Sequence, residues 1–399
     1  MILRARIVLP INGPPIENGA ISIKGARIVA VGKWNELRGG KVTDLGGVVL
    51  LPGLINAHCH LDYSDMRMTR GGKSFTQWAQ TIIKKKNDWT TADYRKSWVR
   101  GARMLEKTGT TTVADIEAVP QMLPWAWKQT ALRVCSFLEI TGVASGRNPK
   151  DILSDALKKT ATLKSEGIGL SPHALYSTAP DLLKLTAKRA RKMRITMHVA
   201  ESDDEVAMYS RRKGELFDWL SRVRDMSDCG GVTPVEAVHR AGLLGPNFLA
   251  VHANYLTDDD VRVLARLKAS VVHCPSSHAY FGHRRFDYEK LARAGVNVCL
   301  GSDSMATMRG RELNMFTEMQ QFARVYSNVL PEQILQMATI NGARALGMEG
   351  KIGELKPGAF ADLIAVRFSG GISNATACIL YATGPSMVII GGQRLKGVK

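Results

Sequence analysis

Short apolar runs alternate with helical patterns through most of this chain. Eight apolar runs of strand length occur at 50–60, 111–116, 132–140, 167–172, 194–199, 247–252, 270–274 and 296–301. Helical spacing of apolar residues marks 94–107, 181–191, 258–268, 310–326 and 331–346. Continuous apolar runs are typical of parallel strands buried on both faces. Eight strand–helix units in series therefore predict an α/β fold that closes into a (β/α)₈ TIM barrel. An open doubly wound sheet is disfavoured, because no Gly-x-Gly-x-x-Gly follows the first run.

The two ends of the chain have a different pattern. Alternating residues over 3–9 precede a turn at 12–15, and strand-like segments follow at 21–23 and 27–32. The last fifty residues repeat this strand–turn–strand pattern at 358–366 and 387–393. We expect the ends, 1–52 and 350–399, to form one small composite β-sandwich domain, with the barrel at 53–349 inserted between them.

The composition is typical of a globular protein without a membrane-spanning segment. The chain has 399 residues, 45% of them hydrophobic, which is enough for a large core. No apolar run reaches the roughly 18 residues of a membrane span, so we expect no membrane association. Six cysteines without a Cys-x-x-Cys pair predict reduced, buried thiols and a cytoplasmic location.

The formal net charge of +18 is compatible with a nucleic-acid partner or an anionic substrate. However, the basic runs at 84–86, 158–159 and 211–213 lie far apart, and no nucleic-acid-binding module accompanies them. We interpret them as solvated helix faces, and we expect a small-molecule substrate rather than a nucleic acid. A homo-oligomer is compatible with the sequence.

Candidate metal ligands stand at the ends of predicted strands. His58 and His60 are two residues apart, so on a strand both side chains point to the same face. His198 ends the fifth run and Asp303 follows the eighth. In a barrel the carboxyl ends of all strands meet at one rim, so these four groups can converge. Three imidazoles and a carboxylate suit one divalent ion, above all zinc, with iron or manganese also feasible.

Catalytic candidates stand beside these ligands. A bound metal ion makes hydroxide available near neutral pH, but a proton acceptor and a proton donor are still needed. Asp303 is suited to accept the proton of the water, Glu201 to protonate a ring nitrogen of the substrate, and His252 to orient the hydroxide. A helix-start carboxylate, favoured by the helix dipole, is the alternative interpretation of Glu201.

Other residues at the same rim are candidates for substrate contact. His173 ends the fourth run, and His278 lies in the loop after the seventh, where it either binds an anionic group or is solvated. Phe75 and Trp78 either stack on a substrate ring or belong to the core. His273 is a candidate for orienting Asp303 from behind.

These segments together resemble the amidohydrolase superfamily, in its branch of ring deaminases and triazine hydrolases. The matching segments are Leu51 to His60, His198 to Glu201, Val251-His252, His273 to Ser277, Gly301 to Asp303, Thr339 to Gly347 and Gly353 to Leu363. The resemblance implies a (β/α)₈ barrel with a small composite β-domain and one metal ion held by His58, His60, His198 and Asp303. It also implies catalytic roles for Glu201 and His252. The segment from Ser74 to Trp78 resembles members linked to aminodeoxyfutalosine deamination, whereas Ser277-His278 departs from the Ser-Asn pair common in the branch.

The sequence therefore predicts a metal-dependent hydrolase of non-peptide C–N bonds. The expected reaction is hydrolytic deamination of an amino-substituted heteroaromatic, such as a purine nucleoside or aminodeoxyfutalosine, by metal-activated hydroxide. The alternatives are a hydrolase of the same fold that cleaves another C–N or a C–halogen bond, a basic nucleic-acid-binding protein, and a barrel that only binds a ligand.

Overall fold

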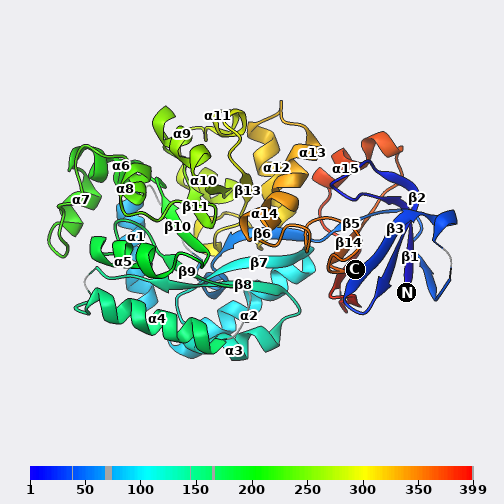
Figure 1. Cartoon of the computed structure of the whole chain (residues 1–399), viewed down its shortest axis with the longest axis horizontal. Helices are drawn as coiled ribbons and strands as arrows, with labels where there is room; N and C mark the ends of the chain where they lie inside the picture. The colour runs from blue at the N-terminus through cyan, green and yellow to red at the C-terminus, as the bar shows by residue number, and fades with distance from the viewer. Residues whose placement is uncertain (38, 68–73, 144, 164–166, 398–399) are drawn as a thin grey trace.

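A barrel and a separate sheet make up the molecule, with both chain ends in the separate sheet (Figure 1). The computed structural model describes residues 1–37, 39–67, 74–143, 145–163, 167–397. Eight parallel strands form the barrel in chain order: β6 (Leu54–Cys59), β7 (Thr110–Glu117), β8 (Arg133–Ile140), β9 (Ile168–Pro172), β10 (Ile195–Val199), β11 (Phe248–His252), β12 (Ser270–His273) and β13 (Val298–Leu300). The predicted TIM barrel is confirmed.

Backbone hydrogen bonds close the barrel between its first and last strands. The amides of Ser302 and Asp303 both donate to the carbonyl of His58 at 3.1 Å, and the amide of His60 donates to the carbonyl of Asp303 at 3.3 Å. This close approach requires a glycine at position 301, because a Cβ there would lie 2.9 Å from the backbone oxygen and the Cβ of His58. The same contacts bring the carboxyl ends of β6 and β13 together.

The prediction of a single first strand at 50–60 is wrong. The run at 50–60 is two strands, β5 (Val48–Pro52) and β6, which belong to different sheets. Only Gly53 separates them, and it packs so closely on Thr111 that a Cβ there would lie 2.1 Å from a methyl carbon of that side chain. The chain therefore passes from one sheet to the other without a loop.

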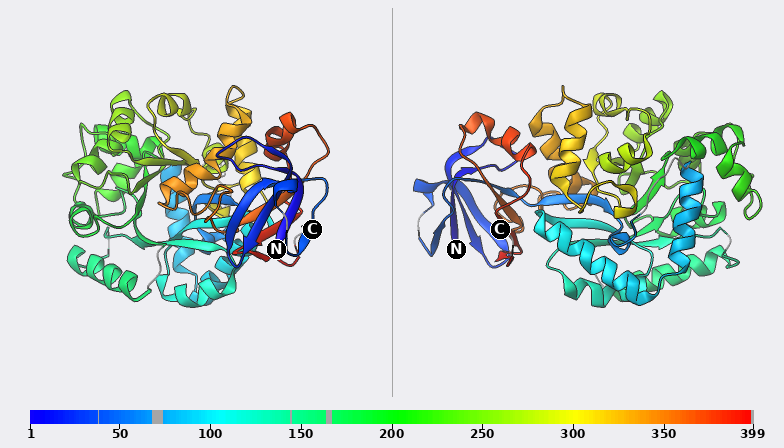
Figure 2. Two further views of the ribbon diagram at one scale, coloured as in Figure 1. Left: turned by 45° about the vertical axis from the view of Figure 1, so that its right-hand side comes forward. Right: turned by 180° about the vertical axis from the view of Figure 1, so that it is seen from behind.

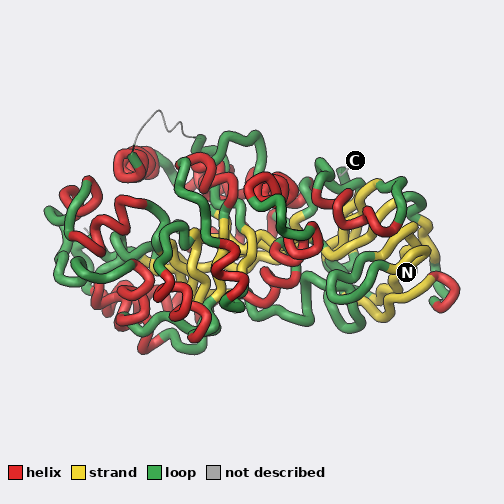
Figure 3. Tube along the Cα trace, turned by 90° about the horizontal axis from the view of Figure 1, so that it is seen from above, coloured by secondary structure: helices red, strands yellow, loops and turns green. Residues whose placement is uncertain are grey.

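Helices surround the barrel strands, as the views from the side and from above show (Figures 2 and 3). They are α1 (Phe75–Asn87), α2 (Thr91–Lys107), α3 (Leu123–Ala126), α4 (Pro149–Leu163), α5 (Pro180–Arg189), α6 (Asp203–Arg211), α7 (Glu215–Leu220), α8 (Pro234–Arg240), α9 (Asp258–Arg266), α10 (Pro275–Phe281), α11 (Tyr288–Arg293), α12 (Met315–Val325), α13 (Pro331–Met337) and α14 (Ile340–Ala345). Short 3₁₀ helices are η1 (Trp34–Glu36), η2 (Leu61–Tyr63), η3 (Pro120–Met122), η4 (Trp127–Gln129), η5 (Met305–Thr307) and η6 (Ile372–Asn374). The helical stretch expected at 331–346 is two helices, because Thr339 leaves the helical conformation (φ −138°, ψ −99°).

The chain ends share one mixed sheet, hereafter the terminal sheet. Its strands are β1 (Ile2–Val8), β2 (Ile16–Lys24), β3 (Arg27–Lys33), β4 (Val42–Asp44), β5, β14 (Leu363–Arg367), β15 (Met387–Ile390) and β16 (Gln393–Arg394), with helix α15 (Ala375–Leu380) beside it. Its central pairing joins β5 antiparallel to β14, so segments from opposite ends of the chain lie side by side. The domain boundaries expected at 52/53 and 349/350 stay a prediction.

Two apolar clusters pack around the terminal sheet. Leu3, Ile21, Leu50 and Leu363 belong to a cluster within that sheet. The largest cluster packs helices against the outside of the barrel and also includes Val49 and Ile364 of the terminal sheet. Strands β10 and β11 are buried at every residue, as expected for parallel strands covered on both faces. Within the described residues, no helix is long and apolar enough to cross a membrane.

Candidate metal centre and cavity

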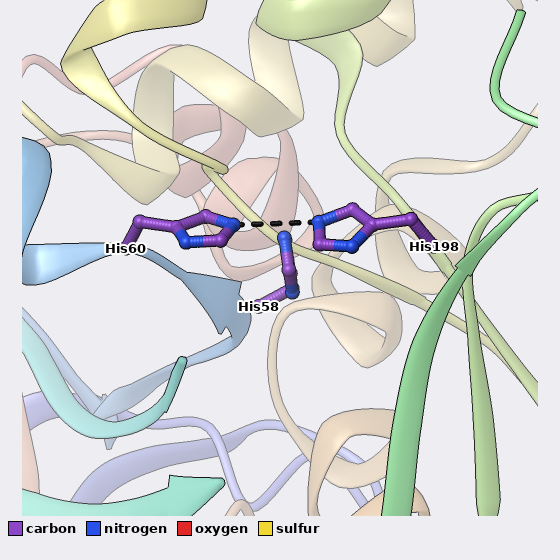
Figure 4. Close-up of side chains that lie close together, drawn as sticks. All are labelled: His58, His60 and His198. Carbon is purple, nitrogen blue, oxygen red and sulfur yellow. Dashed lines mark hydrogen bonds between the residues drawn. The ribbon is translucent and has the colours of Figure 1, made fainter. Parts of the chain in front are cut away.

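Three histidines from two strands converge at the carboxyl end of the barrel (Figure 4). His58 lies on β6, His60 follows it by one residue beyond the strand end, and His198 lies on β10. One ring nitrogen from each lies within 4.8 Å of the other two. The Nε2 atoms of His60 and His198 are 3.3 Å apart. The three side chains are buried.

These imidazoles are in the neutral form that a metal ligand requires. Burial lowers the pKa of His58 and His60 well below the usual value, and the nearby imidazoles, His198 first, lower it further. The ring Nδ1 of His198 is 2.6 Å from the backbone carbonyl of His173, which only accepts, so Nδ1 carries the hydrogen. The Nε2 atom of His198 therefore presents a lone pair to the cluster.

Asp303 adds a carboxylate to the three imidazoles. Its Oδ1 atom lies 3.8 Å from the Nε2 atoms of His58 and His60. Its Oδ2 atom accepts a hydrogen bond of 2.8 Å from the hydroxyl of Thr307. Burial raises the pKa of Asp303, whereas the hydrogen bond from Ser277, the nearby His198 and Thr307 oppose that rise. The backbone at Asp303 has a φ of +57°, a left-handed conformation that residues other than glycine rarely adopt.

The donor set fits a divalent metal ion. Neither ring nitrogen of His58 has a hydrogen-bond partner within the described chain, although both are buried. Buried polar atoms without a partner are rare and need an explanation. Two nitrogen ligands of a tetrahedral zinc ion lie roughly 3.3 Å apart, given Zn–N bonds of about 2.0–2.1 Å. The 3.3 Å between His60 and His198 matches that separation.

Glu201 lies beside this cluster at the start of a helix. Ser202 caps α6 by accepting the amide hydrogen of Glu205 at 3.2 Å, and the Glu205 side chain accepts the amide hydrogen of Glu201 at 2.8 Å. The bond to Glu205 fixes the backbone of Glu201, and the side chain of Glu201 lines a cavity. Burial raises the pKa of Glu201 well above the usual value, and the nearby Asp303 and Glu205 carboxylates raise it further. Burial therefore favours the protonated form of Glu201.

His252 contacts both Glu201 and the histidine cluster. Its Nε2 atom lies 3.5 Å from Oε1 of Glu201 and has no hydrogen-bond partner in the described structure. Its ring centroid is 5.4 Å from that of His198. Burial, followed by the charges of His198 and His58, lowers the pKa of His252 well below the usual value. Burial thus favours the neutral form of both groups in the Glu201–His252 contact.

A cavity of about 480 Å³ opens in front of these groups. Its polar lining includes His60, His173, His198, Glu201, Asp303 and Thr307, and its apolar lining includes Tyr63, Phe75, Trp78, Ile82, Tyr176, Trp219 and Val223. Phe75 and Trp78, both from α1, have ring centroids 6.1 Å apart. His173 is 2.7 Å from the Ser177 hydroxyl through its Nδ1 atom, and burial lowers its pKa to about 3. The cavity thus combines aromatic walls with a small number of polar groups, as small-molecule sites do.

Four of the sequence candidates are absent from the cavity lining: His58 and His252, whose contacts are described above, and His273 and His278. His278, which was expected in a loop, lies in α10. His278 is 3.0 Å from Oδ1 of Asn254 through its Nδ1 atom, and Asn254 donates to the carbonyl of Glu201 at 3.0 Å. His273 stacks on Phe286, with centroids 4.0 Å apart. The roles expected of His278 and His273 stay predictions.

Sequence reasoning missed polar residues of the cavity. Lys86 was interpreted as part of a solvated run, but its side chain lines the cavity and lies 3.7 Å from Glu139. The last turn of α1 directs it inward while Lys84 stays exposed. The one signal for Glu139 was a charged residue within the apolar run at 132–140.

Comparisons with known proteins agree with this geometry. Residues 49–395 match the amidohydrolase family. The 5-methylthioadenosine/S-adenosylhomocysteine deaminase of Moorella thermoacetica is 30% identical over 388 residues, which cover 92% of this chain and 85% of that protein.

Solved structures share the fold. An adenosine deaminase from Xanthomonas campestris with bound zinc matches with a TM-score of 0.84 and 24% identity, over 98% of this chain and 92% of that one. The aminofutalosine deaminase of Helicobacter pylori, in complex with methylthio-coformycin, has a TM-score of 0.85 and 21% identity, over 99% of both chains. The zinc-containing atrazine chlorohydrolase of Arthrobacter aurescens has a TM-score of 0.83 and 20% identity, over 99% of this chain and 94% of that one.

Proposed function

The chain belongs to the amidohydrolase family, and from that premise we propose that it deaminates an adenine-bearing nucleoside by hydrolysis. One observation carries the proposal: the buried carboxyl of Glu201, whose pKa is raised by burial, stands beside a cluster of three buried histidines and Asp303, and it lines the same cavity as His60, His198 and Asp303. The relative from Moorella is named for deamination of two such nucleosides. The aromatic walls of the cavity are suited to a purine ring.

His58, His60, His198 and Asp303 would hold the metal ion, which we propose to be zinc. When bound, the ion lowers the pKa of a water molecule and acts as a Lewis acid. Imidazole and carboxylate ligands are those that zinc accepts, and they also suit iron or manganese.

The remaining chemistry belongs to the side chains. Glu201 donates its proton to a ring nitrogen, which makes the amine-bearing carbon electrophilic. Asp303 accepts a proton from the attacking water and passes it to the leaving amine, and His252 orients that water. The oxygen of water becomes the carbonyl oxygen of the product and nitrogen leaves as ammonia. The second proton of the same water molecule restores the protonated form of Glu201, so no proton is gained or lost by the enzyme over one turnover.

Ammonia release tests this function. The purified protein with zinc should release ammonia from adenosine or a 5′-substituted adenosine, and the product should show the ultraviolet spectrum of the corresponding inosine. Glu201→Gln should retain zinc but lose turnover, because the amide cannot donate a carboxylic proton. Absence of ammonia from all purine nucleosides, or chloride release from halogenated triazines instead, would overturn the proposal in favour of a C–halogen hydrolase.

We also propose a reducing, cytoplasmic location. The six cysteines are all free and five of them are buried, which suits a compartment where thiols stay reduced. The expectations of a homo-oligomer and of no nucleic-acid partner stay part of this proposal. Salt-dependent retention on DNA that survives metal removal would contradict the second.

A further inference from the structure

An ion pair stands in the wall of the cavity without a part in the proposed chemistry. Lys86 extends from α1 and Glu139 from β8, and the Lys86 Nζ atom lies 3.7 Å from Oε1 of Glu139. Both side chains line the same cavity as Glu201 and Asp303. One tenth of the Glu139 side chain and about a quarter of the Lys86 side chain are exposed. A carboxylate as buried as that of Glu139 is rare unless it has a partner or a function.

The pair has unused hydrogen-bonding capacity. The Oε2 atom of Glu139 is buried and has no hydrogen-bond partner within the described chain. The 3.7 Å contact to Lys86 is longer than a hydrogen bond. A buried ion pair that served stability alone would satisfy its remaining lone pairs, because an unpaired buried acceptor costs free energy.

Both members are charged. Burial alone would raise the pKa of Glu139, but Lys86 first, then His173 and His198, outweigh it and lower that pKa. Burial opposes the charge of Lys86 as well, but Glu139 and Asp62 outweigh it and raise its pKa. The wall therefore presents a carboxylate and an ammonium with no net charge between them.

The chemistry of the pair selects a neutral ligand with neighbouring hydroxyls. A ligand carboxylate would be repelled by Glu139, and a ligand ammonium would be repelled by Lys86. Two adjacent hydroxyl groups can donate to the carboxylate and also accept from the ammonium. Hydrogen bonds to charged groups are the stronger ones, so this arrangement stabilises a diol well.

The pair lies at a suitable place for the sugar of a nucleoside. Glu139 lies on β8, His173 directly follows β9, and Glu201 follows β10. These three strands are neighbours in the barrel. Two strand spacings amount to roughly 10 Å along the rim, comparable with the length of a purine nucleoside. A base held at Glu201 would extend past His173 and place its ribose at Glu139.

We propose that Glu139, assisted by Lys86, recognises the 2′- and 3′-hydroxyls of a ribonucleoside and so determines sugar specificity. The inference rests on the proposed function, since it names the part of the nucleoside that this wall binds. Glu139 acts on binding and positioning and takes no part in proton transfer.

The test compares substrates that differ only in the sugar. We expect the wild-type enzyme to deaminate adenosine with a kcat/KM roughly 10- to 100-fold above that for 2′-deoxyadenosine or 3′-deoxyadenosine, because a bond to a charged group is lost. Glu139→Gln should lower kcat/KM for adenosine by a similar factor, mainly through KM, and change the value for the deoxynucleosides by less than threefold. Lys86→Met should likewise lower kcat/KM for adenosine more than for the deoxynucleosides.

Controls separate recognition from folding. Lys84→Met, on the exposed side of the same helix, should leave kcat/KM unchanged for adenosine and for both deoxyadenosines. Calorimetric binding of inosine and 2′-deoxyinosine to the Glu139→Gln protein provides a readout besides turnover, and the variant should lose the preference for inosine. If kcat/KM of Glu139→Gln falls equally for adenosine and the deoxynucleosides, or if the variant keeps the wild-type preference for ribose, the inference is wrong. The proposed deamination would be unaffected by either result. A wild-type protein that deaminates none of these nucleosides would instead overturn the proposed function.

Discussion

The carboxyl rim of the barrel and the terminal sheet are built by opposite rules. Every buried side-chain polar atom without a hydrogen-bond partner in the described chain belongs to the barrel part, between His58 and Glu318, whereas the strands of the terminal sheet contain none. Atoms of His58, His60 and His252 are examples at the carboxyl rim. Left-handed backbone occurs at Ala200 just after β10, at His252 at the end of β11 and at Asp303 after β13. Such groups and conformations cost free energy, so the rim reduces stability where the chemistry is, and the apolar cores supply the stability that offsets it.

The largest expected difference between the two regions concerns Asp303. Asp303→Asn removes the carboxylate that accepts the proton of water, and kcat should fall by about a thousandfold or more. The Tm should stay within a few degrees, since a buried charge is lost together with its interactions. Ammonia release and thermal unfolding of the same preparation measure both. Activity within tenfold of wild type would contradict the role of Asp303.

A core truncation in the terminal sheet should show the reverse behaviour. Ile21 is fully buried in the apolar cluster of that sheet, so Ile21→Ala should lower the free energy of unfolding by about 2–5 kcal/mol. At a temperature where the variant is folded, kcat/KM should stay within about twofold.

Leu300→Ala is the matched variant at the rim. Leu300 is equally buried but lies on the strand that precedes Asp303. It should lower both stability and kcat/KM, because a cavity there lets the strand end shift. Denaturant unfolding and steady-state kinetics measure the two effects, and a loss of activity in Ile21→Ala as large as in Leu300→Ala would remove the distinction between the regions.

Metal removal should affect the rim alone. A chelator should abolish ammonia release and lower stability by about 3 kcal/mol relative to protein with free zinc at a hundred times its dissociation constant. Hydrogen exchange should accelerate at the carboxyl ends of β6, β10 and β13 and stay unchanged in β1 and β2. Zinc should restore both activity and protection, whereas faster exchange throughout the terminal sheet would show that the two regions are coupled.

The smallest effect is the pH dependence due to Glu201. Because its pKa in the folded protein is raised above the unfolded value of about 4.3, the folded state binds a proton that the unfolded state releases. Stability of the metal-free protein should therefore fall as pH rises above about 4.3, until Glu201 ionises in the folded state as well. Glu201→Gln lacks this titration, so its stability relative to wild type should increase as the pH rises above about 4.3. Denaturant unfolding at several pH values measures the difference, and parallel curves would contradict a protonated Glu201.

The sequence predicted the fold well because its periodicities are local. Runs such as 194–199 and 247–252 agree with β10 and β11 within a residue. The run at 50–60 misled because apolar character does not reveal which sheet a strand joins. Only the pairing of β5 with β14, a segment more than three hundred residues later, separates it from β6.

The strand-end positions of His58, His60, His198 and Asp303 were determined by sequence alone, since parallel strands of a barrel present their carboxyl ends at one rim. Tertiary structure decided the protonation state and the charge of each polar group at that rim. The proton on Glu201 depends on its burial near Asp303, and the charge on Glu139 depends on Lys86, which a linear pattern assigned to solvent. Burial and distance govern these charges, and both arise only when residues far apart in the chain pack together.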